Sequence, residues 1–259
     1  MPFRRAVTDA LSPAVWLQIM QARQVLASVS GRPWRDAWSL NKRLALEQSR
    51  LSILPPWFRK SPSFVIDVGA NQGQWIGALL EILPVEETWI FEPNPEAMKI
   101  CRRRVGDRNG ARYFDMALGD KTGQITLHVT AASDFASVLQ PRDEFLKTHY
   151  GKTATEVVID RQVEVRTLDS LVPESKPVDL LKIDVQGFER AVLSGAGRVL
   201  ANTRAVLIEA NLESHYVNDD NFPAIWMLLA ERGFSFWNLS TPFRGQGGKA
   251  LWADAVFVR

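Results

Sequence analysis

At 259 residues, the chain is long enough for one large α/β domain, or for one domain with an extension. Its hydrophobic fraction of 46% supports a sizeable core and excludes a disordered protein. The single cysteine, Cys101, excludes an internal disulfide and is consistent with a reducing compartment. The net charge of +2 is uneven, because residues 1–60 hold ten Lys or Arg against three Asp or Glu, a net +7.

The N-terminal sequence has the pattern of neither a membrane span nor an export signal. Its most apolar stretch, residues 13–29, is interrupted by Gln18, Gln21, Arg23 and Gln24, whereas a span needs about 20 predominantly apolar residues. The start, MPFRRAVTDALSPAV, lacks both a continuous apolar run and a cleavage site. We therefore expect a cytoplasmic protein.

Residues 1–60 are expected to form a helical extension. An apolar stripe at four- and three-residue spacing is formed by Val15, Ile19, Ala22, Leu26 and Val29. Gly31-Arg32-Pro33 ends this pattern, and a second helical stretch runs from about Trp34 to the pair Pro55-Pro56. The proline pair marks the predicted boundary with a domain over residues 61–259.

After this boundary, strand and helix patterns alternate. Strands are expected over residues 64–68, 88–92, 111–115, 124–129, 157–166, 178–185, 204–211, 234–239 and 252–258. Helices are expected over residues 72–83, 95–105, 188–193 and 222–232. The last two strands are predicted to pair. Repeated strand–helix units predict a mostly parallel sheet with helices on both faces.

The turn after the first strand has the pattern of a ligand site. The stretch FVIDVGANQG, residues 64–73, places small residues between a strand and a helix, where backbone N–H groups face a ligand. A dinucleotide site needs G-x-G-x-x-G, but Gly69 and Gly73 are spaced G-x-x-x-G with Asn71 between them, which disfavours a nicotinamide oxidoreductase. Asp67 would repel phosphates and suits a ligand with a cationic centre.

S-adenosyl-L-methionine matches this chemistry, because it carries a sulfonium, an ammonium group and ribose hydroxyls but no phosphate. Glu92 ends the second strand, 19 residues after Gly73, and is expected to accept hydrogen bonds from both ribose hydroxyls. Asp115 and Met116 end the third strand and are expected to line the adenine. Each acid alone could equally cap a helix or end a strand in solvent. Three acids at successive strand ends favour one cofactor site, because open α/β sheets bind ligands at those ends.

Several segments, in this order, resemble the FkbM family of S-adenosylmethionine-dependent methyltransferases: FVIDVGANQGQW, WIFEPNPE, the TLDSL–VDLLKIDVQGFE–VLSGA block, AVLIEAN and DAVFVR. The resemblance covers roughly residues 62–259 and leaves out residues 1–60. It implies a class I methyltransferase fold, usually a seven-stranded sheet with one antiparallel strand. By position, it assigns cofactor binding to Asp67, Gly69, Asn71, Gly73, Glu92, Asp115, Met116 and Ala117. The family's usual chemistry is O-methylation of sugars or secondary metabolites.

The reacting end of the site is expected where the fourth and fifth strands end. Methyl transfer needs an aligned acceptor about 3–3.5 Å from the methyl carbon, and a hydroxyl acceptor also needs a base or a metal. Asp184 and Glu209 end these strands and are candidate catalytic groups or, together, ligands for a divalent cation such as Mg²⁺. His215 is a candidate general base, weighed against a simple exposed loop histidine. Lys182 is expected to alternate away from the site and to pair with another charge.

The leading prediction is an O-methyltransferase acting on a sugar hydroxyl of a glycan, a glycolipid or a glycosylated natural product. Methylation of nucleobase amines is disfavoured, because the Asn/Asp-Pro-Pro-aromatic sequence of such enzymes is replaced here by Asp184-Val185-Gln186-Gly187. An RNA methyltransferase would use the basic N-terminal region and its interleaved tryptophans, Trp16, Trp34, Trp38 and Trp57. A helical cap whose tryptophans pack on the main domain is the preferred interpretation of that region. A non-catalytic S-adenosylmethionine-binding module, contact with an anionic membrane surface and a homo-oligomer stay open.

Overall fold

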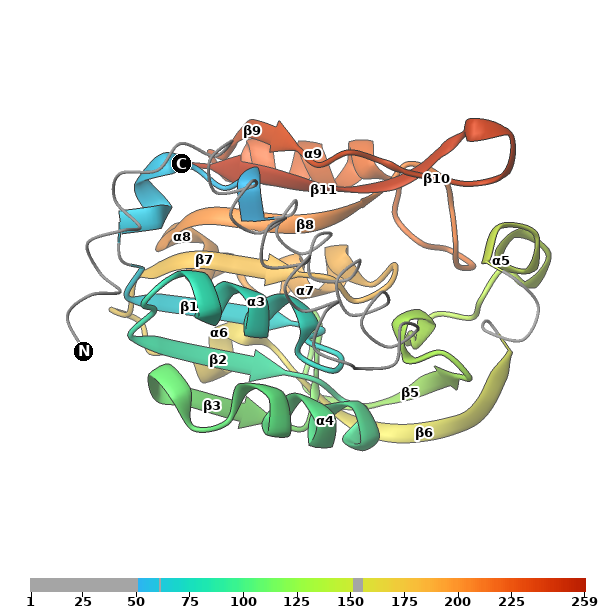
Figure 1. Cartoon of the computed structure of the whole chain (residues 1–259), viewed down its shortest axis with the longest axis horizontal. Helices are drawn as coiled ribbons and strands as arrows, with labels where there is room; N and C mark the ends of the chain where they lie inside the picture. Colours follow the sequence, from blue (N-terminus) through green and yellow to red (C-terminus); the bar gives the residue numbers. More distant parts are fainter. Residues whose placement is uncertain (1–50, 61, 151–155) are drawn as a thin grey trace, which may run out of the picture. The chain divides into compact units, whose positions relative to one another are not determined.

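The computed structural model describes residues 51–60, 62–150 and 156–259 (Figure 1). Most of the expected helical extension, with Trp16, Trp34 and Trp38, therefore lies outside the described residues, and its boundary stays a prediction. Its last residues form a short 3-10 helix, η2 (Pro56–Lys60). Phe58 is buried, and the Arg204 guanidinium lies 4.0 Å from the ring centroid of Trp57, so η2 packs on the domain.

Among the described residues, eight strands form the central sheet, in the order β10-β11-β8-β7-β1-β2-β3 with β9 also paired to β11 (Figure 1). They are β1 (Phe64–Val68), β2 (Glu87–Phe91), β3 (Ala111–Phe114), β7 (Val178–Ile183), β8 (Thr203–Asn211), β9 (Ser235–Leu239), β10 (Phe243–Arg244) and β11 (Ala250–Val258). From β3 to β8 all neighbours are parallel, whereas β11 is antiparallel to β8, β9 and β10. The mostly parallel sheet with one antiparallel strand is confirmed, as is the pairing of the last two expected strands; the two-residue β10 is an addition.

Helices cover both faces of this sheet, as the alternating pattern predicted. Figure 1 shows α3 (Gln74–Ile82) and α4 (Pro95–Val105) in front of the sheet, with α6 (Leu168–Leu171), α7 (Glu189–Ser194), α8 (Gly197–Ala201) and α9 (Phe222–Glu231) behind it. Behind the sheet, Ile66 of β1, Leu193 of α7 and Leu229 of α9 share one fully buried core cluster. None of the described helices combines the length and apolar composition needed to cross a bilayer.

A second, three-stranded sheet follows β3. It contains β4 (Ala117–Leu118), β5 (Gly123–Thr130) and β6 (Val157–Arg166), in the order β4-β6-β5. Its small core is made by Ala117, Leu127, Val163 and Val165. The short helix η4 (Ser133–Phe135) and the helix α5 (Asp143–Tyr150) lie between β5 and β6 in the chain. The strands β5 and β6 were expected from the sequence, but their separation into a sheet of their own, and α5, were not.

Candidate functional site

The turn after β1 has a backbone that few side chains tolerate. Gly69, Asn71 and Gly73 all have positive φ, at 74°, 48° and 73°. A Cβ atom on Gly69 would lie 1.8 Å from the carbonyl oxygen of Asp184, and one on Gly73 would lie 2.7 Å from Cys101 Sγ. Asparagine is among the few other residues that adopt this conformation readily. The glycine spacing therefore reflects a tight turn pressed between the end of β7 and the middle of α4.

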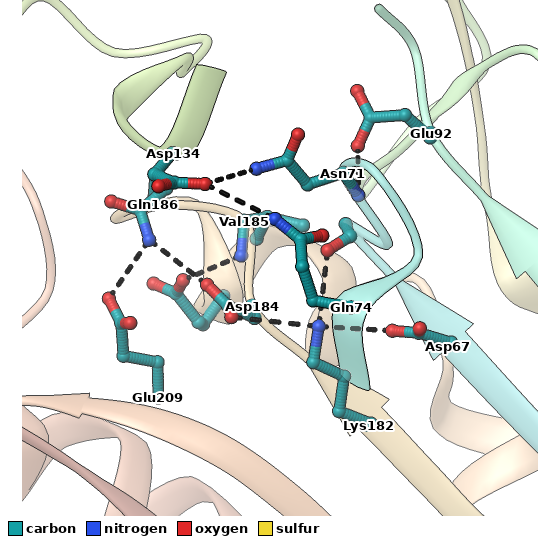
Figure 2. A network of polar contacts seen from close by, with 12 residues as sticks. Asp67, Asn71, Gln74, Glu92, Asp134, Lys182, Asp184, Val185, Gln186 and Glu209 are labelled. Carbon is teal, nitrogen blue, oxygen red and sulfur yellow. Dashed lines mark hydrogen bonds and ion pairs between the residues drawn. The ribbon is translucent and has the colours of Figure 1, made fainter. Parts of the chain in front are cut away.

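Glu92 directly follows β2 and ties its strand end to this turn. Its Oε2 atom accepts a hydrogen bond from the Asn71 backbone N–H at 2.7 Å (Figure 2). Its Oε1 atom accepts one from the Asn94 backbone N–H at 2.8 Å. Burial raises the pKa of Glu92 to about 7, although these hydrogen bonds and Lys182 favour the ionised form. Each carboxylate oxygen keeps further accepting capacity, which is what two ribose hydroxyls would need.

A buried lysine lies directly beneath the turn. The Lys182 ammonium is 3.0 Å from Asp67 Oδ1 and 3.6 Å from Asp184 Oδ2, and it donates a hydrogen bond to the Gly69 carbonyl at 3.1 Å (Figure 2). The expectation that Lys182 turns away from the site is wrong. Asp67 and Lys182 are register partners on β1 and β7, so both side chains lie on the same face of the sheet. Asp67 itself is fully buried.

The segment after β3 lies at the same edge of the sheet. Asp115 is half exposed and pairs with Arg102 of α4 at 2.9 Å. Met116 packs against the main core, and Ala117 begins β4. The Phe114 ring at the end of β3 stacks on Phe91 at the end of β2, with ring centroids 4.5 Å apart. The role of Asp115, Met116 and Ala117 beside an adenine stays a prediction.

The loop between β5 and α5 contacts the turn after β1 through side-chain hydrogen bonds. Asp134 Oδ1 accepts hydrogen bonds from Asn71 Nδ2 at 2.7 Å and from Gln74 Nε2 at 3.5 Å (Figure 2). The Gln72 side chain donates to Ser133 Oγ at 3.1 Å. Nothing in the sequence indicated these contacts, because a contact between residues about 60 positions apart leaves no periodic signal.

The structure brings Asp184 and Glu209 together, as neighbouring parallel strand ends require. The side-chain nitrogen of Gln186 donates to Asp184 Oδ1 at 3.0 Å and to Glu209 Oε1 at 3.2 Å (Figure 2). Gln186 was not singled out from the sequence. Within the part of the chain that the structure describes, no three His, Cys, Asp or Glu side chains are grouped to hold a metal ion. The arrangement therefore gives Mg²⁺ no support beyond the two carboxylates.

His215 is buried rather than exposed on a loop. Its Nδ1 atom lies 2.7 Å from the Glu213 carbonyl oxygen, which can only accept, so Nδ1 carries the proton and donates. Its Nε2 atom then accepts from the Tyr150 hydroxyl at 2.8 Å. Burial lowers the pKa of His215 and raises that of Tyr150. Tyr150 ends α5, the helix that the sequence did not predict, and so was missed.

The strand order and the antiparallel β11 are those of a class I methyltransferase, the fold that the sequence resemblance implied. The family model for the methyltransferase FkbM domain matches residues 67–236, which contain every site residue named above.

The chain is also similar to individual proteins. It is 28% identical over 179 residues to 2-O-methyltransferase NoeI of Sinorhizobium fredii, a match covering 66% of this chain and 72% of that protein. It is 28% identical over 147 residues to Methyltransferase 1 of Beauveria bassiana, where the match covers 51% of this chain and only 58% of the relative. A solved structure, magnesium protoporphyrin IX methyltransferase from Synechocystis with bound SAH, aligns over 89% of each chain with a TM-score of 0.48 and 9% identity. By the match of the family model, the chain belongs to the FkbM family of S-adenosylmethionine-dependent methyltransferases.

Proposed function

We propose that the protein methylates a hydroxyl group of a sugar, on a glycan, a glycolipid or a glycosylated natural product. The carrying observation is the convergence at one sheet edge of the Gly69–Gly73 turn, the Glu92 carboxylate and the paired acids Asp184 and Glu209. The relative named a 2-O-methyltransferase supports an oxygen acceptor. The sugar is the expectation that the family resemblance adds.

The side chains at this edge fit a cationic cosubstrate. Asp67, Asp184 and Glu209 outnumber the single Lys182 among them, so the formal charge is negative. Lys182 is neutralised by the two aspartates it contacts, and this limits its repulsion of a sulfonium. Gly69 packs directly against the Asp184 carbonyl, so the turn is held close to the Asp184 end of this edge. When bound, S-adenosyl-L-methionine supplies an electrophilic methyl group and leaves as S-adenosylhomocysteine.

The residues beside the acids offer a route for the proton of the acceptor hydroxyl. As the hydroxyl oxygen forms its bond to the methyl carbon, its proton must pass to a base. The Tyr150 hydroxyl can take this proton while it gives its own to His215 Nε2, which already accepts that hydrogen bond. Burial lowers the pKa of His215, which favours the neutral imidazole that can accept a proton. Glu209 and Asp184 remain alternatives for the same role.

The test uses labelled S-adenosyl-L-methionine and a panel of glycosides, with RNA as the competing acceptor. Calorimetry should show binding of S-adenosyl-L-methionine and S-adenosylhomocysteine but not of NAD(H), and the label should pass to a glycoside. Glu92→Ala should weaken cofactor binding by about tenfold or more, because hydrogen bonds to charged groups contribute about 1.5–3 kcal/mol each. Tyr150→Phe should lower turnover without weakening cofactor binding. Tighter binding of NAD(H), or transfer to RNA alone, would overturn the proposal.

A further inference from the structure

Gln186 holds the two acids of the reacting end through one amide group. Carboxylate oxygens only accept hydrogen bonds, so the amide nitrogen must face Asp184 and Glu209, at 3.0 and 3.2 Å. The amide oxygen accepts from the hydroxyl of Tyr216, a buried side chain, at 2.9 Å. The orientation of the amide is thus set from both ends, and both of its N–H groups have a carboxylate partner.

The backbone beneath this side chain is held in an unusual conformation. Gln186 has a φ of 57°, the left-handed region that a glycine adopts far more cheaply. Its carbonyl oxygen accepts from Ser137 Oγ at 2.7 Å. The buried Glu189 carboxylate accepts from the backbone N–H groups of Val185 and Gly187, both at 3.1 Å. These hydrogen bonds fix the loop on both sides of Gln186, so the amide is pre-organised between the acids.

The amide nitrogen links the same two carboxylates that a shared metal ion would link. A divalent cation at this edge would be held by the carboxylates of Asp184 and Glu209, because such ions take oxygen ligands. The Gln186 nitrogen already donates to one oxygen of each carboxylate. We infer that Gln186 is a positioning residue. Its amide holds the Asp184 and Glu209 carboxylates together, as a shared divalent cation would, so that methyl transfer needs no metal ion. The inference rests on the proposed function, which places the reaction at these acids.

The experiment exchanges the amide for a carboxylate of the same length. In Gln186→Glu the donor is lost and three carboxylates converge, which favours binding of a hard divalent cation. We expect millimolar Mn²⁺ to raise the melting temperature of this variant by about 3 °C or more, through ligand-linked stabilisation. The unaltered protein should show no such shift, and its methyl transfer should be indifferent to EDTA. Gln124→Glu, an exposed exchange on β5, is the matched control and should gain no Mn²⁺ response.

A second variant keeps the inference testable if Gln186→Glu does not fold. Gln186→Leu removes the donor without adding a ligand, while Lys182 stays 3.6 Å from Asp184 and shared with Asp67. The repulsion between Asp184 and Glu209 then grows, and the acid limb of the rate–pH profile should move upward by about one unit. The melting-temperature assay needs no methyl acceptor, so it can fail or succeed independently of the proposed sugar substrate. The inference is overturned if Mn²⁺ stabilises the unaltered protein, if EDTA stops its methyl transfer, or if folded Gln186→Glu ignores Mn²⁺. An unmoved pH profile in Gln186→Leu would also overturn it.

Discussion

Replacing Glu92 with glutamine should remove a pH-dependent cost of folding. The pKa of Glu92 is about 7 in the folded protein, against an ordinary value of 4.5. The folded state therefore holds the proton more tightly than the unfolded chain, and the free energy of unfolding falls as the pH rises from about 4.5 through 7. With about 1.36 kcal/mol for each pKa unit, the stability contributed by this one group falls by about 2.5 kcal/mol between pH 5 and pH 8.

Glutamine at position 92 cannot titrate, so this part of the pH dependence should disappear. One of the two backbone N–H groups, of Asn71 or Asn94, loses its acceptor, because the new side chain has a single oxygen. That loss costs about 1–3 kcal/mol at every pH. The free energy of unfolding of Glu92→Gln, measured relative to that of the unaltered protein, should therefore rise by about 2.5 kcal/mol between pH 5 and pH 8.

Urea unfolding at pH 5 and pH 8 gives the free energy of unfolding of the variant and of the unaltered protein. The prediction concerns how the difference between these two proteins changes with pH. Glu81→Gln, an exposed exchange on α3, controls for the removal of one negative charge. If the two proteins differ in free energy of unfolding by the same amount at both pH values, the prediction is wrong. Such a result would mean that the two backbone donors and Lys182 outweigh the burial of the carboxylate.

The other predictions concern cofactor binding and catalysis. Gly69→Ala should abolish the thermal stabilisation by S-adenosylhomocysteine, because its Cβ atom would lie 1.8 Å from the Asp184 carbonyl; a normal shift would show that the turn can move aside. Asp184→Asn and Glu209→Gln should nearly abolish methyl transfer yet keep that stabilisation, and full activity in both would place the chemistry elsewhere. His215→Ala should lower turnover by about 10²-fold or more if it receives the proton, which initial rates on a glycoside acceptor would measure. RNA binding at physiological salt should be absent; sub-micromolar, salt-sensitive binding lost with the basic N-terminal region would contradict this.

The sequence predicted the central sheet well because its strands are continuous apolar runs closed by polar residues. It also predicted that Glu92 and the Asp184–Glu209 pair lie at one edge, since parallel strands present their carboxyl ends together. Lys182 was misplaced, although its even spacing from Asp184 along one strand would have put both on the same face.

Other parts of the site had no signal in the sequence. Tyr150 reaches His215 across 65 positions, and Asn71 reaches Asp134 across 63. Such contacts depend on where loops of the second sheet fold back over the first, which neither residue type nor periodicity encodes. The contacts of the Gln186 amide could not be predicted either, because they depend on a positive φ at a residue type that rarely adopts one.

The contact between Gly73 and Cys101 gives the protein a built-in reporter. Cys101 is the single cysteine of the chain, is fully buried, and its pKa is raised by burial to about 12. Such a thiol is inert toward alkylating reagents until the surrounding structure opens. Its sulfur would lie only 2.7 Å from a Cβ on Gly73, so exposing it requires the turn and α4 to separate. The rate at which a thiol reagent labels Cys101 in the native protein therefore reports how often this turn opens, with no engineered probe. A ligand bound at the turn should slow the labelling.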